Sequence, residues 1–338
     1  MQIPLEDFVK LAPLKAKVHN KVTALRRAHG VAFGCTSAPR PEGYVEDDPT
    51  LCPTNSEWSS WLEPELSEYK QVLLKILSEG PPVDTRGLAK IDSDSLWVWG
   101  GPTPYWGGSM ADDILVKGAD YFAADNVVYV YGPTNEKMLG LHSKYKRMLC
   151  QINANCRTPG ALEGGSEEDN AERLSRFSLQ FPNIVGAMCD DVTLGSKDVI
   201  DPEPFEKRYL ALKKHNPALK MYGVFYGFEM HKDFTPILPY FDVVNLWLGE
   251  MDHILQYDEF IALTQQKFPG KPIISGIFMH EYAVDAGNSP ELLAYQLDRA
   301  REYITRGILE GVILLGDREI KKWPAVAESV RHYLQNQV

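Results

Sequence analysis

Eight short apolar segments, each followed by a segment of helical length or pattern, predict an α/β fold of the (β/α)8 class, a TIM barrel with an N-terminal helical and loop extension. The segments span residues 95–100, 126–132, 147–153, 183–191, 220–228, 241–249, 271–278 and 309–316. They are rich in Val, Ile, Tyr, Phe and Trp and lack strict polar alternation, which is typical of parallel strands buried on both faces. The sequence contains neither a GxGxxG nor a Walker A motif, which disfavours an open, doubly wound sheet.

The segments between the apolar runs carry their own helix signals. Residues 166–169 (Ser-Glu-Glu-Asp) resemble a capping box with Asp in place of Glu, and residues 289–291 (Ser-Pro-Glu) combine an N-cap residue with proline at the first helical position. Gly307 marks the end of the second of these helices. The stretch 231–240 leaves room for only a turn or two, so it predicts a shortened helix after the fifth strand.

Residues 1–90 precede the predicted barrel as an N-terminal extension, which leaves residues 91–338 for the barrel, close to the roughly 250 residues that such barrels need. A first helix is predicted from four apolar residues that share one face, Leu14, Val18, Val22 and Leu25. A second helix is predicted over residues 64–77, after an irregular loop at 34–56 that is rich in Pro, Gly, Asp and Thr. We expect the extension to pack on the barrel, either against its N-terminal face or beside the cleft.

The composition of the chain disfavours some classes of binding partner. The net charge of −11 disfavours nucleic acid, whose phosphates require clustered Lys and Arg. No run approaches 18 apolar residues, so no membrane span is predicted, and the N-terminus MQIPLEDFVK lacks the apolar core of a signal peptide. We therefore expect a cytoplasmic protein with a small-molecule or oligosaccharide substrate and no cofactor, although a secretion signal trimmed from this chain stays open. The five cysteines show no metal-like CxxC spacing and are expected to be reduced structural thiols.

Carboxylates gather where two of the predicted strands end, which is where TIM barrels carry their active sites. Asp190 and Asp191 end the fourth run, and Glu281 ends the seventh, across the mouth of the barrel. Because side chains alternate along a strand, we expect one aspartate to face the barrel axis and the other a neighbouring loop. Cleavage of a glycosidic bond needs one carboxyl group as acid and a second as nucleophile or base. The sequence therefore predicts Asp190, Asp191 and Glu281 as catalytic residues, with the choice between the two aspartates open.

Aromatic and polar side chains at the other strand ends are predicted to bind the substrate. Flat aromatic rings suit the apolar faces of sugar rings, and amide or carboxylate groups suit their hydroxyls. The predicted residues are Trp99, Trp106, Tyr131, Asn153, Tyr226, Glu229, Trp247 and His280. Glu229 and Glu250 lie two or more residues past their strands, which makes them less favoured as catalytic groups.

Three motifs carry a resemblance to barrel glycoside hydrolases, and more closely to a set of uncharacterised bacterial glycoside hydrolase-like (β/α)8 barrel proteins. PNIVGAMCDDV (182–192) is similar to their strand that ends in paired aspartates, GIFMHEYAVDAG (276–287) to a strand with an acid before an aromatic residue, and ITRGILEGVILLGDREI (304–320) to their closing strand. The resemblance covers about residues 180–338. It implies a carbohydrate-active hydrolase.

Two other functions remain open from the sequence. The first is a metal-dependent sugar lyase, isomerase or epimerase that holds Mg²⁺ or Mn²⁺ with Asp190, Asp191, Glu229 and His280. The second is a barrel that binds a glycan through its aromatic residues without catalysis. A Ser-His-Asp hydrolase is disfavoured because the sequence has no GxSxG nucleophile elbow.

Overall fold

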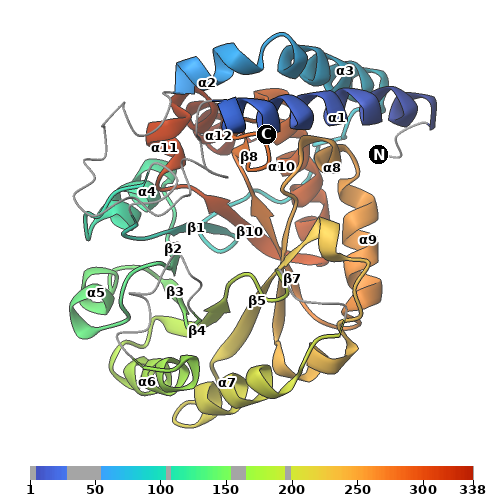
Figure 1. Ribbon diagram of the computed structural model, residues 1–338. Coiled ribbons are helices and arrows are strands. Elements are labelled where there is room, and N and C mark those ends of the chain that lie inside the picture. The colour runs from blue at the N-terminus through green and yellow to red at the C-terminus, as the bar shows by residue number, and fades with distance from the viewer. Residues whose placement is uncertain (1–4, 29–54, 104–107, 154–164, 195–198, 338) are drawn as a thin grey trace.

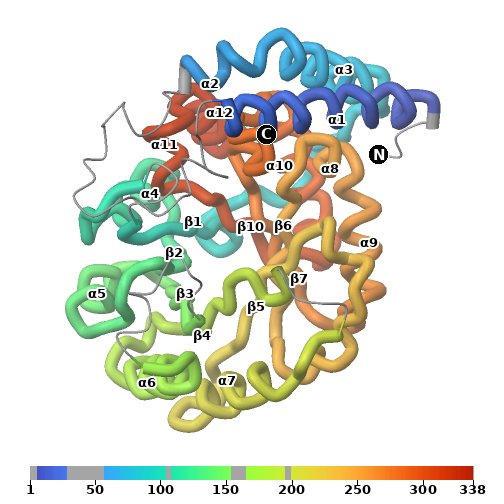
Figure 2. The backbone as a smooth tube through the Cα atoms, viewed as in Figure 1, coloured from blue at the N-terminus to red at the C-terminus, as the bar shows by residue number. Residues whose placement is uncertain are grey.

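Eight parallel strands close into a barrel in the computed structural model, which describes residues 5–28, 55–103, 108–153, 165–194 and 199–337 (Figures 1 and 2). The barrel strands are β1 (Leu96–Gly100), β2 (Asn126–Tyr129), β3 (Arg147–Gln151), β4 (Ile184–Cys189), β5 (Lys220–Tyr226), β6 (Val243–Trp247), β7 (Ile273–Ile277) and β10 (Leu309–Leu315). Strands adjacent in the chain are adjacent in the barrel, and β1 pairs with β10 to close it. The predicted TIM barrel is therefore confirmed, and each observed strand lies within its predicted apolar run.

Helices follow the strands and form the outer layer (Figure 1). They are α4 (Ile114–Phe122), α5 (Glu136–Leu141), α6 (Glu167–Gln180), α7 (Glu203–Lys213), η3 (Thr235–Tyr240), α8 (Met251–Leu255), α9 (Tyr257–Lys267), α10 (Pro290–Thr305), α11 (Glu319–Lys322) and α12 (Pro324–Gln335). Ser166 and Asp169 form the predicted capping box, and Ser289 caps α10. The shortened fifth helix is η3, a short 3₁₀ helix.

Close packing inside the barrel selects specific small and large residues. The interior contains Trp97, Trp99 and Trp247, where barrels more often use Val, Ile and Leu. A Cβ atom on Gly276 would lie 1.9 Å from the indole of Trp247, so only glycine fits beside that ring. The large side chain of Trp247 at the C-terminal end of β6 thus requires a residue without a side chain on β7.

The N-terminal extension packs beside the C-terminal ends of β6 and β7. It consists of α1 (Leu5–Ala28), α2 (Asn55–Leu62) and α3 (Glu65–Glu79), which lie together at one end of the molecule (Figures 1 and 2). Apolar residues of these helices share a core with residues of α8, α10 and the segment that follows β7. In that segment β8 (His280–Glu281) and β9 (Ala286–Gly287) form a small hairpin, and Trp58 of α2 donates a hydrogen bond to the Val284 carbonyl at 2.8 Å. The extension thus lies beside the cleft end of the barrel.

Two expectations from composition concern the described residues directly. Cys150 in β3 and Cys189 in β4 are buried free thiols, and burial raises the pKa of Cys189 to about 12. The predicted thiols at positions 35, 52 and 156 lie outside the described residues. Within the part of the chain that the structure describes, no helix has both the length and the apolar character that crossing a membrane requires.

Candidate active site

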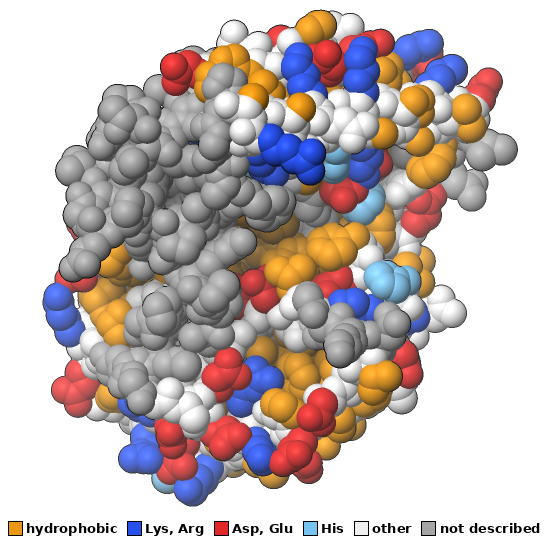
Figure 3. All heavy atoms as spheres, viewed as in Figure 1, with side chains coloured by type: hydrophobic (Ala, Val, Ile, Leu, Met, Phe, Trp, Pro, Cys, Tyr) orange, Lys and Arg blue, Asp and Glu red, His pale blue; other side chains and the backbone are white. Residues whose placement is uncertain are grey.

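A cavity of about 310 Å³ opens at the C-terminal ends of the barrel strands. Seven aromatic residues contribute to its wall: Trp99, Tyr131, Tyr226, Phe228, Trp247, Phe278 and Tyr282. Four charged side chains also line it: Asp190, Asp191, Glu250 and Arg318. Figure 3 shows hydrophobic side chains in the hollow at the centre of this face, with acidic side chains beside them. The cavity therefore combines flat apolar walls with a small number of ionisable groups, as small-molecule sites usually do.

Asp190 follows β4 and is only 7% exposed. The Asn153 side chain fixes its backbone, because its Oδ1 accepts from the Asp190 amide at 2.8 Å and its Nδ2 donates to the Asp190 carbonyl at 2.7 Å. Burial, followed by the negative charge of Asp191, raises the pKa of Asp190 well above its usual range. Asp190 is thus a carboxyl group that keeps its proton to unusually high pH. Asn153 does not line the cavity, and its side chain instead fixes the backbone of Asp190.

The backbone turns sharply at Asp191, whose φ of 49° lies in the left-handed region. This conformation is uncommon outside glycine, although Asp adopts it more readily than most residues. It interrupts the alternation of side chains, so that Asp190 and Asp191 both line the cavity. Both aspartates therefore reach one cavity, and the expectation that one faces the barrel axis and the other a neighbouring loop stays a prediction. The hydroxyl of Tyr226, at the end of β5, donates to Asp191 Oδ1 at 2.6 Å.

The aromatic wall is built from rings that pack on one another. Trp99 donates from Nε1 to the Tyr131 hydroxyl at 2.9 Å and meets Trp247 edge to face at 5.7 Å between ring centroids. At the rim, Tyr226 and Phe228 stack at 5.3 Å with an interplanar angle of 11°, and Phe228 is 45% exposed. Four of the predicted aromatic residues thus line one cavity, whereas Trp106 lies outside the described residues.

Arg318, just after β10, lines the cavity although sequence reasoning missed it. Its side chain is 2% exposed, and Nη2 donates to the hydroxyls of Tyr282 at 2.6 Å and Tyr131 at 3.3 Å. The only signal in the sequence is its position one residue beyond Asp317, at the end of the eighth predicted strand. Arg318 donates to two phenols of the wall and brings a positive charge to the cavity.

Asp317, also at the end of β10, is a second buried acid with a raised pKa. Its Oδ2 accepts from the Gly101 amide at 2.7 Å, and a Cβ atom on Gly100 would lie 2.1 Å from this same oxygen. Burial raises the pKa of Asp317 to about 6, against the opposing effect of the Arg318 charge. Asp317 is therefore held against Gly100, the last residue of β1, and against Gly101.

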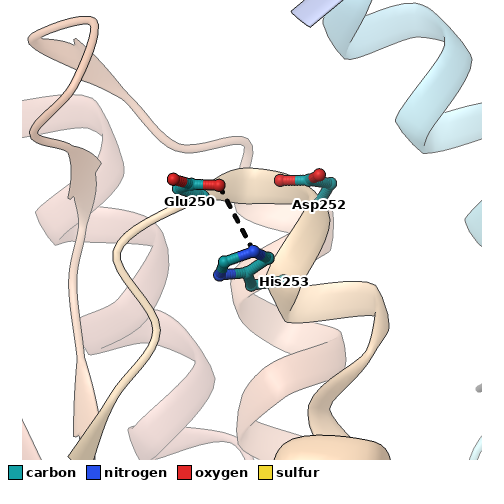
Figure 4. A group of neighbouring side chains, drawn as sticks. All are labelled: Glu250, Asp252 and His253. Atoms are coloured by element: carbon teal, nitrogen blue, oxygen red, sulfur yellow. Dashed lines mark ion pairs between the residues drawn. The ribbon is translucent and has the colours of Figure 1, made fainter. Parts of the chain in front are cut away.

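Glu250 brings a carboxylate to the cavity from the end of β6. The ammonium group of Lys15, on α1, forms an ion pair with Glu250 and lies 2.9 Å from both carboxylate oxygens of Asp252. Figure 4 shows Glu250, Asp252 and His253 converging, with His253 Nε2 3.3 Å from Glu250 Oε2. These three residues are close enough to hold a metal ion together. The Lys15 ammonium already places a positive charge between the two carboxylates.

Glu281 is not among the described residues that line the cavity, contrary to the expected common pocket. Its side chain is fully buried, and Oε2 accepts from the backbone amide of Met251 at 2.9 Å. Oε1 lies 3.5 Å from Nε2 of His19, on α1. Glu281 therefore supports the segment that carries Glu250 and does not itself reach the cavity.

Two further predicted residues have buried partners elsewhere. Glu229 is 1% exposed, accepts from Thr193 at 3.0 Å and pairs with Lys232 at 2.7 Å. His280 is 2% exposed and lies 2.8 Å from Glu319 Oε1. Neither is among the cavity-lining residues of the described chain. The metal-ligand set proposed from sequence, which joined both to the two aspartates, is therefore not brought together.

Comparisons with known proteins find partial likenesses to solved structures. No protein family is matched by the sequence, and no curated protein matches it. Among solved structures, a β-glucuronidase from Bacteroides uniformis aligns at 16% identity over 67% of this chain and 30% of its own, with a TM-score of 0.44. A β-glucuronidase from Ruminococcus gnavus aligns at 10% identity over 66% and 43%, with a TM-score of 0.42. A chitinase from Bacteroides thetaiotaomicron aligns at 9% identity over 70% and 98%, with a TM-score of 0.43.

The chain thus spans less than half the length of the two glucuronidases. At these identities and TM-scores the likeness carries nothing about the activity or substrate of this chain. The function must therefore be inferred from the cavity and the side chains that line it.

Proposed function

We propose that this protein is a carbohydrate-active hydrolase that cleaves a glycosidic bond at the C-terminal face of the barrel. The observation that carries the proposal is the junction after β4, where Asp190 and Asp191 enter one cavity with largely aromatic walls. One of these acids has a strongly raised pKa and lies beside a second carboxylate. Acid catalysis on a sugar leaving group requires such a protonated carboxyl near neutral pH.

Asp190 is the proton donor in this proposal. Its side chain is buried, its backbone is clamped by Asn153, and the charge of Asp191 favours its protonated form. When the glycosidic bond breaks, the proton passes from the Asp190 carboxyl to the departing oxygen. Asp191, held by the Tyr226 hydroxyl, then serves to keep Asp190 protonated before each turnover.

Glu250 takes the place that the sequence assigned to Glu281. A glycosidase needs a second carboxylate, either as nucleophile or as base for a water molecule. Glu250 lines the same cavity as Asp190 but follows β6, two strands away in the barrel. The separation of the two carboxyl groups in a substrate complex, about 5–5.5 Å or 6.5–9.5 Å, distinguishes retention from inversion.

The walls favour a sugar with exposed apolar faces. Trp99, Trp247 and Phe278 pack together inside the cavity, and the stacked pair of Tyr226 and Phe228 extends the aromatic surface to the rim. Sugar rings present C–H faces to such surfaces. The substrate class is therefore a small glycoside or an oligosaccharide, with the exposed Phe228 at the entrance available to a second ring.

The test is hydrolysis of a panel of 4-nitrophenyl glycosides, with the anomeric product identified by NMR. Turnover that is unaffected by EDTA and is lost in Asp190→Asn supports the proposal. Turnover that disappears with EDTA indicates a metal-dependent enzyme. Quenching of tryptophan fluorescence by sugars without any turnover indicates a glycan-binding barrel.

A further inference from the structure

The N-terminal helix α1 reaches the candidate active site through one side chain. Lys15 lies 235 residues from Glu250 in the chain, yet its ammonium group pairs with the Glu250 carboxylate and with both oxygens of Asp252. Burial lowers the pKa of Lys15, but the charges of Asp252 and Glu250 outweigh it and keep the pKa above its ordinary value. Lys15 is therefore a cation that α1 holds against a carboxylate of the cavity wall.

The segment around Glu250 shows why this contact matters. Glu250 precedes α8 in the N-cap position, but its side chain makes no capping hydrogen bond. The first amide of α8, that of Met251, instead donates to the buried Glu281 carboxylate at 2.9 Å. The Glu250 side chain is thereby released from the role that an N-cap residue usually has. Its direction is set by Lys15 on one side and His253 on the other.

We propose that Lys15 is a positioning residue that holds the Glu250 carboxylate in the active-site cavity, so that the N-terminal extension completes the site. The catalytic consequence rests on the function proposed above, whereas the positioning itself does not. His19, one turn further along α1, lies 3.5 Å from the Glu281 carboxylate that caps α8. The same helix thus contacts Glu250 itself and Glu281, the acid that holds the first amide of α8.

Packing of α1 fixes the position of the Lys15 ammonium group. Lys15 is joined to α1, and α1 is held in place by Val18 and Val22, both buried in the core shared with α8. The position of the cation is therefore fixed by packing, and the carboxylate that it contacts is fixed with it. Displacements of about 1 Å in a reacting group can lower a rate by about 100-fold.

The experiment compares Lys15→Met with Lys17→Met in the full chain. Methionine keeps the apolar stem of Lys15 and removes its charge, while Lys17 is a neighbouring lysine on the same helix whose partner is the half-exposed Glu68. We expect Lys15→Met to lower kcat about 10- to 100-fold, with KM changed less than about threefold, on the 4-nitrophenyl glycoside that the wild type hydrolyses fastest. Lys17→Met should leave both constants unchanged, and Lys15→Arg should recover part of kcat.

Hydrogen–deuterium exchange over residues 249–255 measures the positioning without any substrate. Faster exchange in Lys15→Met than in Lys17→Met supports the positioning role of Lys15. If neither the wild type nor any variant hydrolyses a glycoside, the proposed function is wrong, but this result still supports the positioning role. Equal exchange and equal kcat in the two variants would overturn it. Should Lys15→Met not fold, Lys15→Gln, which keeps a hydrogen-bond donor, is subject to the same comparison.

Discussion

Carboxylates occupy two neighbouring regions of the barrel mouth, and the two regions treat them differently. At the end of β4, Asp190 and Asp191 lie side by side, with hydrogen bonds from the Tyr226 hydroxyl and from a backbone amide. At the ends of β6 and β7, cationic or imidazole side chains accompany the acids: Lys15 and His253 beside Glu250, and His19 beside Glu281. The first region raises the pKa of an acid, whereas the second gives its acids positively charged or titratable partners.

The difference shows that the role of a carboxylate at a strand end depends on the groups around it. Burial beside a like charge favours the protonated form, which is what a proton donor requires. Burial beside a cation gives an ion pair that sets the position of a segment. Glu281 also sets the position of a segment, because it accepts from the Met251 amide, although like Asp191 it follows a barrel strand.

The largest effect is expected from Asp190→Asn, which removes the proposed proton donor. General acid catalysis contributes about 100- to 10,000-fold, so we expect kcat to fall about 1000-fold, while sugar binding changes little. Steady-state kinetics with a 4-nitrophenyl glycoside and a fluorescence titration measure the two quantities. Asp120→Asn, at an exposed ion pair with Lys144, serves as the control. An active Asp190→Asn enzyme would show that Asp190 is not the proton donor, and the proposed difference in role between the two regions would then be wrong.

A buried ion pair away from the cavity tests the second kind of carboxylate. Lys232→Met leaves Glu229, 1% exposed, without its ammonium partner. Breaking a buried pair in this way costs about 3–5 kcal/mol in the free energy of unfolding. Urea denaturation of Lys232→Met and of Lys144→Met, whose partner Asp120 is exposed, should give a large and a small change respectively. Equal changes would show that burial does not distinguish the two pairs.

The effect of burial on an acid can also be tested at Asp317, which has no proposed catalytic role, through the pH dependence of stability. Its pKa of about 6 in the folded protein exceeds the ordinary value of 3.8, so the folded state binds more protons between these values. The free energy of unfolding that Asp317 contributes therefore falls as pH rises from about 4 to 6, by roughly 3 kcal/mol. Asp317→Asn should lose this dependence and gain stability relative to wild type as pH rises. Asp84→Asn should show the opposite trend, because Arg86 lowers the pKa of the exposed Asp84.

The smallest effect concerns the charge beside Asp190. Asp191→Asn removes the negative charge that helps to raise the pKa of Asp190, so Asp190 should lose its proton at lower pH. We expect the alkaline limb of the pH dependence of kcat/KM to shift to lower pH. Rates across the pH range measure it, with Asp120→Asn as the reference profile. A complete loss of activity in Asp191→Asn would instead make Asp191 a reacting group.

Much of the candidate site was predictable because strand ends converge in a barrel. Trp99, Tyr131, Asp190 and Tyr226 were placed by the rule that active sites lie at the carboxyl ends of the strands. Asn153 was predicted to bind substrate, but its amide instead clamps the backbone of Asp190. Arg318 escaped prediction because a single arginine after a strand carries no pattern. Its role depends on phenols from the segments that follow β2 and β7.

The sequence by itself determined the eight strands, their order around the barrel and the helices between them, because hydrophobic periodicity and capping residues act over a few neighbouring positions. Which acids share the cavity was decided only by tertiary structure. The positive φ of Asp191 brought two adjacent side chains to one cavity, and the amide of Met251 drew Glu281 away from it. Lys15 contacts Glu250, although the two residues are 235 positions apart in the sequence. The position of a carboxylate depends on such distant partners, since hydrogen bonds and ion pairs form between whatever groups the packing brings within reach.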